Sequence, residues 1–398
     1  MVLLGLGRFR SIGKKVKKGK NLFKKEERPV RDNDEIVTCF RDGEVTLRSN
    51  RRIDGFTNAM KEVGYQGVRR GDLVIHNMDA FAGAIGVSDS DGKSTPVYSV
   101  CTPKNNVEAN VYYYAYLLRS YALGGVIQSL AKGIRERSTD FRYKEFGDLY
   151  YQQPPIEEQQ SIASYLDQKC GEIDKLITLQ EEMITKLQSY KQSVITEAVT
   201  KGLDKNLPLK DSGIEWIGEI PEHWSVVKIK YLAKIKSGDS ISSNEIMQEG
   251  IYEVYGGNGL MGFCNKKNVD GVNIIIGRVG ALCGNVRLIS ESKFITDNAL
   301  ILNCFDNALY SYMYIMLKAA NLNNLNTSNA QPLITGSKVL NVSLPIPPLS
   351  EQQSIADYLD QKCSEIDELI SIKQQKIEKL KDYKKSLIFE CVTGKRKV

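Results

Sequence analysis

The clearest pattern along the chain is a regular spacing of apolar positions in two long segments, 154–200 and 347–393. Apolar residues recur there at alternating steps of four and three, and the positions between them are rich in Glu, Gln and Lys. This pattern predicts one long helix in each segment, with a stripe that packs against another helix. Pro155 and Pro348 stand at or just before the first turn, and Gly202 and Gly394 mark the ends.

We call the predicted apolar stripe the seam. The economical way to bury it is to pack the two helices against each other, although each could instead pair with another protein. At about 1.5 Å per residue, 44 helical residues form a rod of roughly 66 Å. The seam is predicted to consist mainly of Ile162, Leu166, Ile173, Leu176 and Leu187 in the first helix, and of Ile355, Leu359, Ile366, Leu369 and Leu380 in the second.

The two segments are copies of each other. They align without a gap at an offset of 193 residues, with 29 of 47 positions identical, which indicates a tandem duplication. The regions before them, 1–153 and 202–346, share little identity but have one outline. Each has an apolar strand with a glycine-spaced turn (71–90 and 271–290), a Tyr-rich helix (111–125 and 308–320), a polar loop (129–141 and 323–337) and a short strand. We therefore predict two α/β (α+β) heads, related by a pseudo-twofold internal repeat.

Composition narrows the function. The chain has 398 residues, 42% hydrophobic and 26% charged, as in ordinary globular proteins. No apolar run reaches the ~18–20 residues of a membrane span, and the short apolar start does not look like a signal peptide, so we expect a cytoplasmic protein. Only two histidines and no CxxC pair occur, which disfavours a His-based hydrolase, a zinc site and a dithiol motif. Cys170 and Cys363, at equivalent helix positions, are expected to be small buried thiols.

A formal charge of +6 favours a polyanionic partner only weakly, but the residues of the heads suit nucleic acid. Arginine can bind guanine with two hydrogen bonds, Asn or Gln can do so with adenine, and Lys or Arg can hold phosphates. Each of these residues taken alone is more often a solvated surface group. The candidates for DNA contact are Arg41, Arg48, Arg51, Arg52, Arg69, Arg70, His76, Asn77, Arg135 and Arg137 in the first head, and Lys236, Tyr255, Asn258, Lys266, Lys267, Arg278, Arg287, Asn326, Asn329 and Gln331 in the second.

Three other features carry weaker signals. The glycines of 255–262 and 277–284 form no Walker or GxGxxG pattern, so we interpret them as turn glycines rather than a phosphate cradle. His76 has no obvious nucleophile or second histidine nearby in sequence, which disfavours catalysis. The segment 8–31 holds eleven basic and two acidic residues and could clamp a DNA backbone or be a basic tail.

Taken together, these motifs resemble the specificity subunit of type I restriction–modification systems. The resemblance rests on the two PPxxEQQSIAxYLDQK helices, on SGIEWIGEIPEHW (212–224), and on the stretches 41–56 and 71–98. It covers nearly the whole chain from about residue 29. It implies target recognition domains at 1–153 and 202–346, separated by antiparallel coiled-coil helices at 154–201 and 347–398.

The resemblance also implies the function. Each head would read one half of a bipartite, asymmetric double-stranded DNA site. The helices would set the spacing between half-sites and dock two methyltransferase subunits, which methylate adenine with S-adenosylmethionine. Restriction and translocase subunits, which use ATP and Mg, would join that core. The chain itself would have no catalytic residue, metal or cofactor, in keeping with the lack of a methyltransferase Asn/Asp-Pro-Pro-aromatic motif.

One departure from the family pattern stands out. The opening that resembles SGIEWIGEIPEHW precedes only the second head, and residues 1–28 replace it before the first with atypical basic sequence. Two alternative functions stay open at this stage. One is a self-contained DNA methyltransferase or nuclease, and the other is a coiled-coil adaptor or rearranged inactive copy that reads no sequence.

Overall fold

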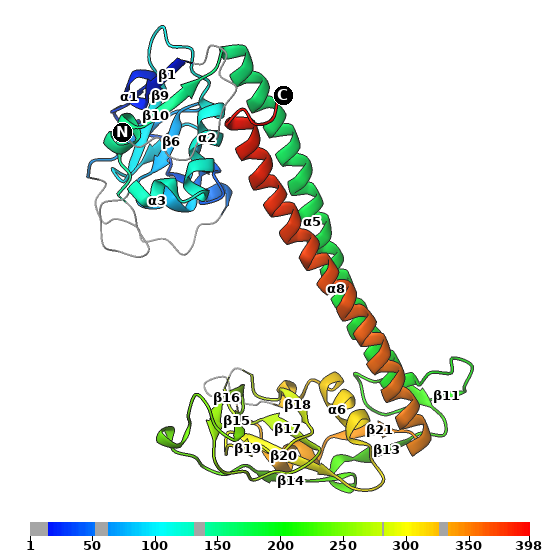
Figure 1. Cartoon of the computed structure of the whole chain (residues 1–398). Coiled ribbons are helices and arrows are strands. Elements are labelled where there is room, and N and C mark those ends of the chain that lie inside the picture. The colour runs from blue at the N-terminus through cyan, green and yellow to red at the C-terminus, as the bar shows by residue number, and fades with distance from the viewer. Residues whose placement is uncertain (1–14, 52–62, 131–139, 281, 326–332) are drawn as a thin grey trace. The chain divides into compact units, whose positions relative to one another are not determined.

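The computed structural model describes residues 15–51, 63–130, 140–280, 282–325 and 333–398. The chain divides into two compact units, 1–180 with 375–398, and 181–374. Each unit therefore contains one head and parts of both long helices. The helices are α5, Ile156–Lys201, and α8, Leu349–Val392. Both heads mix sheets and helices, so the predicted fold class is confirmed (Figure 1).

The first head is built on a four-stranded antiparallel sheet whose strands lie in the order β2-β9-β6-β7. The helix α2, Val111–Leu123, packs on this sheet and buries Tyr113, Tyr114 and Leu118. Short helices α1, α3 and α4 cover Gly19–Leu22, Val126–Leu130 and Tyr143–Asp148. The sheet strands are β2 Phe23–Lys25, β6 Leu73–His76, β7 Ile85–Val87 and β9 Tyr98–Pro103. Three further antiparallel pairs join β1 Lys15–Lys18 with β10 Tyr150–Gln153, β3 Val37–Cys39 with β4 Val45–Leu47, and β5 Gln66–Val68 with β8 Gly92–Ser94.

The second head repeats the four-stranded sheet of the first. Its four-stranded antiparallel sheet has the order β14-β20-β17-β18, and α6, Tyr310–Ala319, packs on it through Tyr312 and Met316. The strands are β14 Ala233–Ser237, β17 Asn273–Gly277, β18 Val286–Ile289 and β20 Ala299–Cys304. A second sheet contains β15 Tyr252–Gly256, β16 Gly259–Cys264 and β19 Phe294–Ile295. The remaining elements are β11 Leu209–Asp211, β12 Glu219–Pro221, β13 Ser225–Lys228, β21 Ser343–Ile346 and α7 Gly336–Leu340.

The atypical N-terminal sequence takes part in this repeat. β1 pairs with β10 just before α5, as β13 pairs with β21 just before α8, and each first strand leads through one short helical turn into the edge strand of the sheet. Leu22 and Phe23 belong to the first core. The basic-tail alternative is therefore wrong for residues 15–28, because apolar residues between the lysines anchor the segment, whereas the alternative of a clamp on a DNA backbone stays a prediction.

The two long helices run antiparallel in each unit. Lys384 Nζ lies 2.6 Å from an Asp174 carboxylate oxygen in the first unit, and Lys191 Nζ lies 2.6 Å from Asp367 in the second. The two pairs are related by the 193-residue offset of the duplication. The end of each long helix docks on its head in a matching way, because the Tyr113 hydroxyl donates to the Val392 carbonyl at 3.1 Å and the Tyr312 hydroxyl donates to the carbonyl of the equivalent residue, Val199, at 3.5 Å.

Eight of the ten predicted seam residues are at least partly buried. Ile162, Leu166, Ile173, Ile355, Leu359 and Ile366 are buried, and Leu187 and Leu380 are partly buried. Leu176 and Leu369 are 45% and 46% exposed, so the prediction is wrong at these two positions.

The physical reason is a change in spacing near the start of each helix. The buried row in α5 runs from Ile162 through Leu166 and Cys170 to Ile173, which is eleven residues in three turns. An eleven-residue spacing fits a straight helix better than a strict seven-residue spacing does. As a result, the next residue that faces the partner helix is the partly buried Ile177 instead of Leu176. The same steps occur at the equivalent positions of α8.

Candidate nucleic-acid interface

The same strand end is built in the same way in both heads. Asn77 directly follows β6, and its N–H donates to the Val97 carbonyl at 3.0 Å. Arg278 directly follows β17, and its N–H donates to the Asn298 carbonyl at 3.0 Å. The carbonyl of Asn77 accepts from the N–H of Phe141 at 3.0 Å, and that of Arg278 accepts from Ile334 at 2.9 Å. Asn77 and Arg278 therefore occupy equivalent positions, each tied to the end of the polar loop that the sequence singled out.

Several arginines of the first head lie on its surface with acidic partners. Arg41 is exposed and donates to Asp79 at 2.9 Å. Arg51 donates to Asp42 at 2.6 Å and lies 4.1 Å over the Phe40 ring. Surface ion pairs of this kind are weak, so these guanidiniums can exchange a carboxylate for a phosphate at little cost. Arg48 is half-buried and donates to Thr38 at 3.3 Å.

Arg69 belongs to the framework of the head. Its guanidinium is mostly buried and binds Asp34 at 3.0 Å and the carbonyls of Val68 and Gly92 at 2.7 and 3.0 Å. A charge this well enclosed is costly to withdraw from its partners, so the geometry favours a structural role over DNA contact. Its neighbour Arg70 is exposed.

His76 and Asn77 close the end of β6. The Nδ1 atom of His76 accepts the Asp79 N–H at 3.1 Å, which places the proton of the neutral ring on Nε2. Burial lowers the pKa of His76, with the Asp79 carboxylate opposing that effect. Asn77 is buried, and its Oδ1 accepts from the Ser99 hydroxyl at 2.8 Å. These contacts make both residues part of the packed strand end.

The basic candidates Lys236, Lys266 and Lys267 of the second head lie on β14 and in the loop that follows β16. Lys236 is exposed on β14. Lys266 donates to Glu245 at 2.6 Å, and this hydrogen bond contributes most to lowering the pKa of Glu245 to about 2. Lys267 pairs with Asp270 at 2.5 Å. Tyr255 is half-buried on β15, 5.6 Å beneath the ammonium group of Lys293.

A group of candidates meets at the turn between β15 and β16. Asn258 is exposed in that turn, and its carbonyl accepts from Arg287 of β18 at 3.1 Å. The turn backbone also lies against the end of β17, because a Cβ atom on Gly257 would come within 2.6 Å of the Asn298 carbonyl and one on Gly277 within 2.4 Å of the Gly257 carbonyl. The glycines thus permit close backbone packing, as turn glycines do. Six candidates lie outside the described residues: Arg52, Arg135, Arg137, Asn326, Asn329 and Gln331.

A second candidate surface lies on the long helices. We call it the repeated surface: exposed positions that are identical in the two copies although they do not pack in a core. Leu176 and Leu369 belong to it, as do Tyr190 and Tyr383, which are 54% and 50% exposed. Large apolar side chains that stay exposed are typical of interaction sites when they gather on one surface. Its members include Gln160, Gln168, Leu176, Lys186 and Tyr190 in α5, and Gln353, Gln361, Leu369, Lys379 and Tyr383 in α8.

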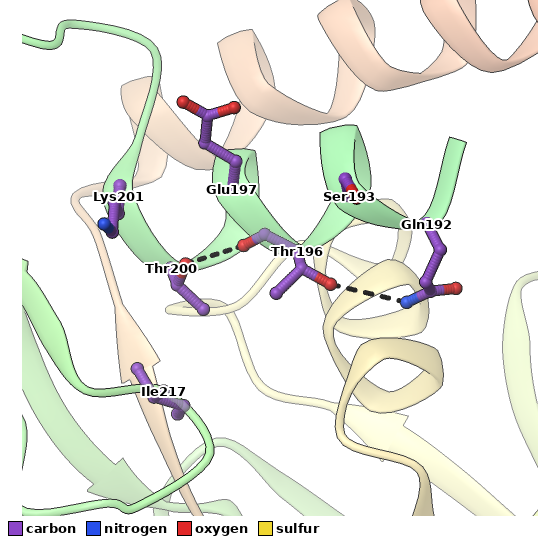
Figure 2. A pocket seen from close by; sticks show the side chains of 7 residues that line it. All are labelled: Gln192, Ser193, Thr196, Glu197, Thr200, Lys201 and Ile217. Atoms are coloured by element: carbon purple, nitrogen blue, oxygen red, sulfur yellow. Dashed lines mark hydrogen bonds between the residues drawn. The ribbon is translucent and has the colours of Figure 1, made fainter. Parts of the chain in front are cut away.

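Two grooves adjoin this surface in the second unit. One has a volume of about 360 Å³ and is lined by Met183, Tyr190 and Leu369 among others. The other has about 820 Å³ and lies between α6, α5 and α8, with Tyr314, Lys318 and Cys363 in its wall. A third pocket of about 440 Å³ lies beside the end of α5 (Figure 2). In that pocket Thr200 and Gln192 bond to Thr196 of the same helix, so the polar lining serves the helix itself.

The start of each long helix is fixed by a set of contacts that the sequence alone did not predict. Glu351 accepts from the Trp224 indole N–H at 3.0 Å and lies 2.7 Å from His223 Nε2. This joins the end of the 212–224 motif to α8. Gln159 accepts the Asn110 N–H at 2.8 Å, and Gln352 accepts the Leu309 N–H at 2.9 Å. The signal was available, because both residue types are identical in the two copies.

The described part of the chain contains no group of three or more His, Cys, Asp or Glu side chains placed to hold a metal ion. Its eight cysteines are free thiols; Cys170 is buried and Cys363 half-buried, and burial raises the pKa of both. None of the described helices has the length and apolar character of a membrane span.

Comparison with known proteins identifies the family. Residues 221–382 match the type I restriction modification DNA specificity domain. The specificity subunit of the type I restriction enzyme MjaX of Methanocaldococcus jannaschii is 30% identical over 324 residues, which are 74% of this chain and 70% of that protein. The specificity subunit of type I restriction enzyme EcoprrI of Escherichia coli is 33% identical over 133 residues, which are 32% of this chain and only 33% of that protein's length.

Solved structures agree on the fold. One from a study of complex assembly and conformational transition of the type I R-M system has a TM-score of 0.75 at 17% identity, covering 96% of this chain and 97% of that chain. The HsdS subunit of Thermoanaerobacter tengcongensis has a TM-score of 0.56 at 17% identity, covering 98% and 99%. The chain therefore belongs to the specificity subunits of type I restriction–modification systems, with a DNA recognition domain, as the sequence motifs predicted.

Proposed function

We propose that the chain is the non-catalytic DNA specificity subunit of a type I restriction–modification complex, in which each head reads one half of a bipartite, asymmetric site in double-stranded DNA. The observation that carries this proposal is the repeated strand end: the four-stranded sheets of the two heads share one strand order, and the same backbone hydrogen bonds hold this strand end, yet the position is Asn77 in one head and Arg278 in the other. One scaffold with different side chains at the same place is what an asymmetric two-part target requires.

The repeated surface supports docking of two methyltransferase subunits. Duplicated segments keep identical core residues because the cores must pack, but that argument does not extend to exposed side chains such as Leu176 and Tyr190. Two copies of the same partner, one on each copy of the surface, account for this identity. In this proposal the partners supply S-adenosylmethionine-dependent adenine methylation, and restriction subunits supply the ATP- and Mg-dependent steps.

The long helices support a spacing role. α5 and α8 each contribute to both units without interruption, so the number of residues in them is a fixed property of the link between the heads. We expect that inserting about four residues in both helices, roughly one turn, changes the tolerated spacing between half-sites. Each half-site sequence should stay the same, because no residue of the heads is altered.

The test is to express the chain with its methyltransferase subunits and to map methylated adenines by long-read sequencing. We expect one gapped motif, and DNA binding that weakens steeply with salt as phosphate contacts release counterions. Methylation by the chain without any partner would show an enzyme instead. Binding indifferent to sequence with the partner present would show an adaptor or an inactive copy.

A further inference from the structure

The end of β17 holds a guanidinium that the protein leaves poorly satisfied. The Nε atom of Arg278 is buried, and the described residues supply no hydrogen-bond acceptor for it. One terminal nitrogen donates to the Ser237 hydroxyl at a long 3.4 Å. No described carboxylate pairs with Arg278, whereas Arg41, Arg51 and Arg69 all have acidic partners. A buried donor without an acceptor is unfavourable, so this side chain gains by turning toward an external acceptor.

The backbone next to Arg278 is open on the side of Gly280, where an added Cβ atom would meet nothing within 4 Å. Gly257 and Gly277 bring the turn between β15 and β16 directly onto the strand end, and Gly280 follows with a left-handed φ of 82°. Arg287 lies at the same turn and donates to the Asn258 carbonyl at 3.1 Å. Two guanidinium groups therefore lie at this turn. Arg287 binds the turn backbone, and Arg278 has one N–H donor, at Nε, that lacks an acceptor.

The equivalent position in the first head is closed. Asn77 is buried, and its side-chain oxygen is occupied by the Ser99 hydroxyl. If this position only contacted phosphates, a basic residue would serve equally well in both heads. A position that differs between two otherwise matched strand ends is instead typical of base reading.

We propose that Arg278 reads a guanine in the half-site recognised by the second head, through paired hydrogen bonds to the O6 and N7 edge. This assignment rests on the proposed function, since it requires that the second head reads DNA. Arginine suits this role better than lysine, because only the planar guanidinium presents two parallel donors to the two acceptors of guanine.

The test compares the complex of this chain and its methyltransferase subunits with complexes carrying Arg278→Ala or Arg278→Lys. The matched control is Lys210→Ala, which removes one positive charge from β11, outside the sheet that carries Arg278. Adenine methylation is mapped by sequencing, and rates are measured on oligonucleotides with each base at every position of both half-sites.

We expect one half-site of the unmodified complex to contain a fixed guanine. In both Arg278 variants discrimination at that guanine should fall about ten- to hundredfold, while the other half-site keeps its sequence. Lys210→Ala should leave the motif unchanged. Unaltered specificity in Arg278→Ala, or full retention in Arg278→Lys, would overturn the guanine assignment. So would a uniform loss at all sequences, which indicates a phosphate contact. If the unmodified complex methylates no defined motif, the proposed function itself fails.

Discussion

The register of the long helices can be tested by truncating two residues that a strict heptad treats alike. Ile366 is 4% exposed and Leu369 is 46% exposed, although both belong to the seam predicted from sequence. We expect Ile366→Ala to lower the free energy of unfolding of the second unit by about 3 kcal/mol, because it removes a buried aliphatic side chain between packed helices. Leu369→Ala should cost less than about 1 kcal/mol.

The smaller loss of stability expected for Leu369→Ala follows from the exposure of Leu369. Complete burial of a leucine side chain contributes about 1.5–3 kcal/mol, and nearly half of the Leu369 side chain already contacts water. Alanine also has a slightly better helix propensity than leucine, which offsets part of the loss. With a urea dependence of about 2 kcal/mol/M, the Ile366 variant should shift the unfolding midpoint by about 1.5 M and the Leu369 variant by less than about 0.5 M.

Tryptophan fluorescence during urea unfolding reports on the second unit, because the chain has two tryptophans, Trp216 and Trp224, and both lie in that unit. Trp224 is fully buried and bonded to Glu351 at the start of α8. An equal loss in the two variants, or a larger loss for Leu369→Ala, would refute the register. The Leu369 variant should retain its fold and instead weaken docking of the methyltransferase subunit.

Arg69→Ala should destabilise the first unit by about 3–5 kcal/mol in calorimetry, because it leaves the buried carboxylate of Asp34 without its charged partner. Arg41→Ala should change that stability by less than about 1 kcal/mol and weaken DNA binding instead, and similar stability losses in the two variants would contradict the assignment of Arg69 to the framework. Because burial lowers the pKa of His76, the folded state favours the neutral ring, so the first unit should lose stability as pH falls below the unfolded pKa of about 6.5. His76→Gln should reduce that loss, and an unchanged pH profile would argue against it. Tyr312→Phe should cost about 1–2 kcal/mol in tryptophan-monitored unfolding, because the Pro345 carbonyl of β21 and the Val199 carbonyl near the end of α5 both lose a donor; a neutral effect would mean that these bonds do not hold β21 and α5 to α6.

The sequence was informative where a physical pattern repeats. Long helices, the duplication and the shared outline of the heads all follow from periodic burial, so the fold class could be predicted. The exposure of Leu176 and Leu369 could not be predicted from the sequence, because a seven-residue repeat and an eleven-residue repeat place most of their apolar residues at the same positions. The segment 15–28 was misjudged since its lysines outnumber the two residues, Leu22 and Phe23, that enter the core.

Site prediction was limited for a different reason. Residue type shows which side chains can contact DNA but not which are already engaged. Arg69 and Arg278 look equivalent as arginines, yet the first is enclosed by Asp34 and backbone carbonyls while the second lacks an acceptor for Nε. The match between Asn77 and Arg278 depends on hydrogen bonds to residues about 20 and 60 positions away, which no local pattern reveals.

The division of the chain into its two units has a consequence for biosynthesis. The second unit is continuous, 181–374, whereas the first combines 1–180 with 375–398. On a ribosome the second unit can complete its core first, although its head follows the other in sequence. The first core must wait for Leu387, Ile388 and Cys391, which pack beside Ile162 and Leu166. Until these residues emerge, the nascent chain exposes an unfinished apolar surface, and that interval is when chaperones would be expected to bind it.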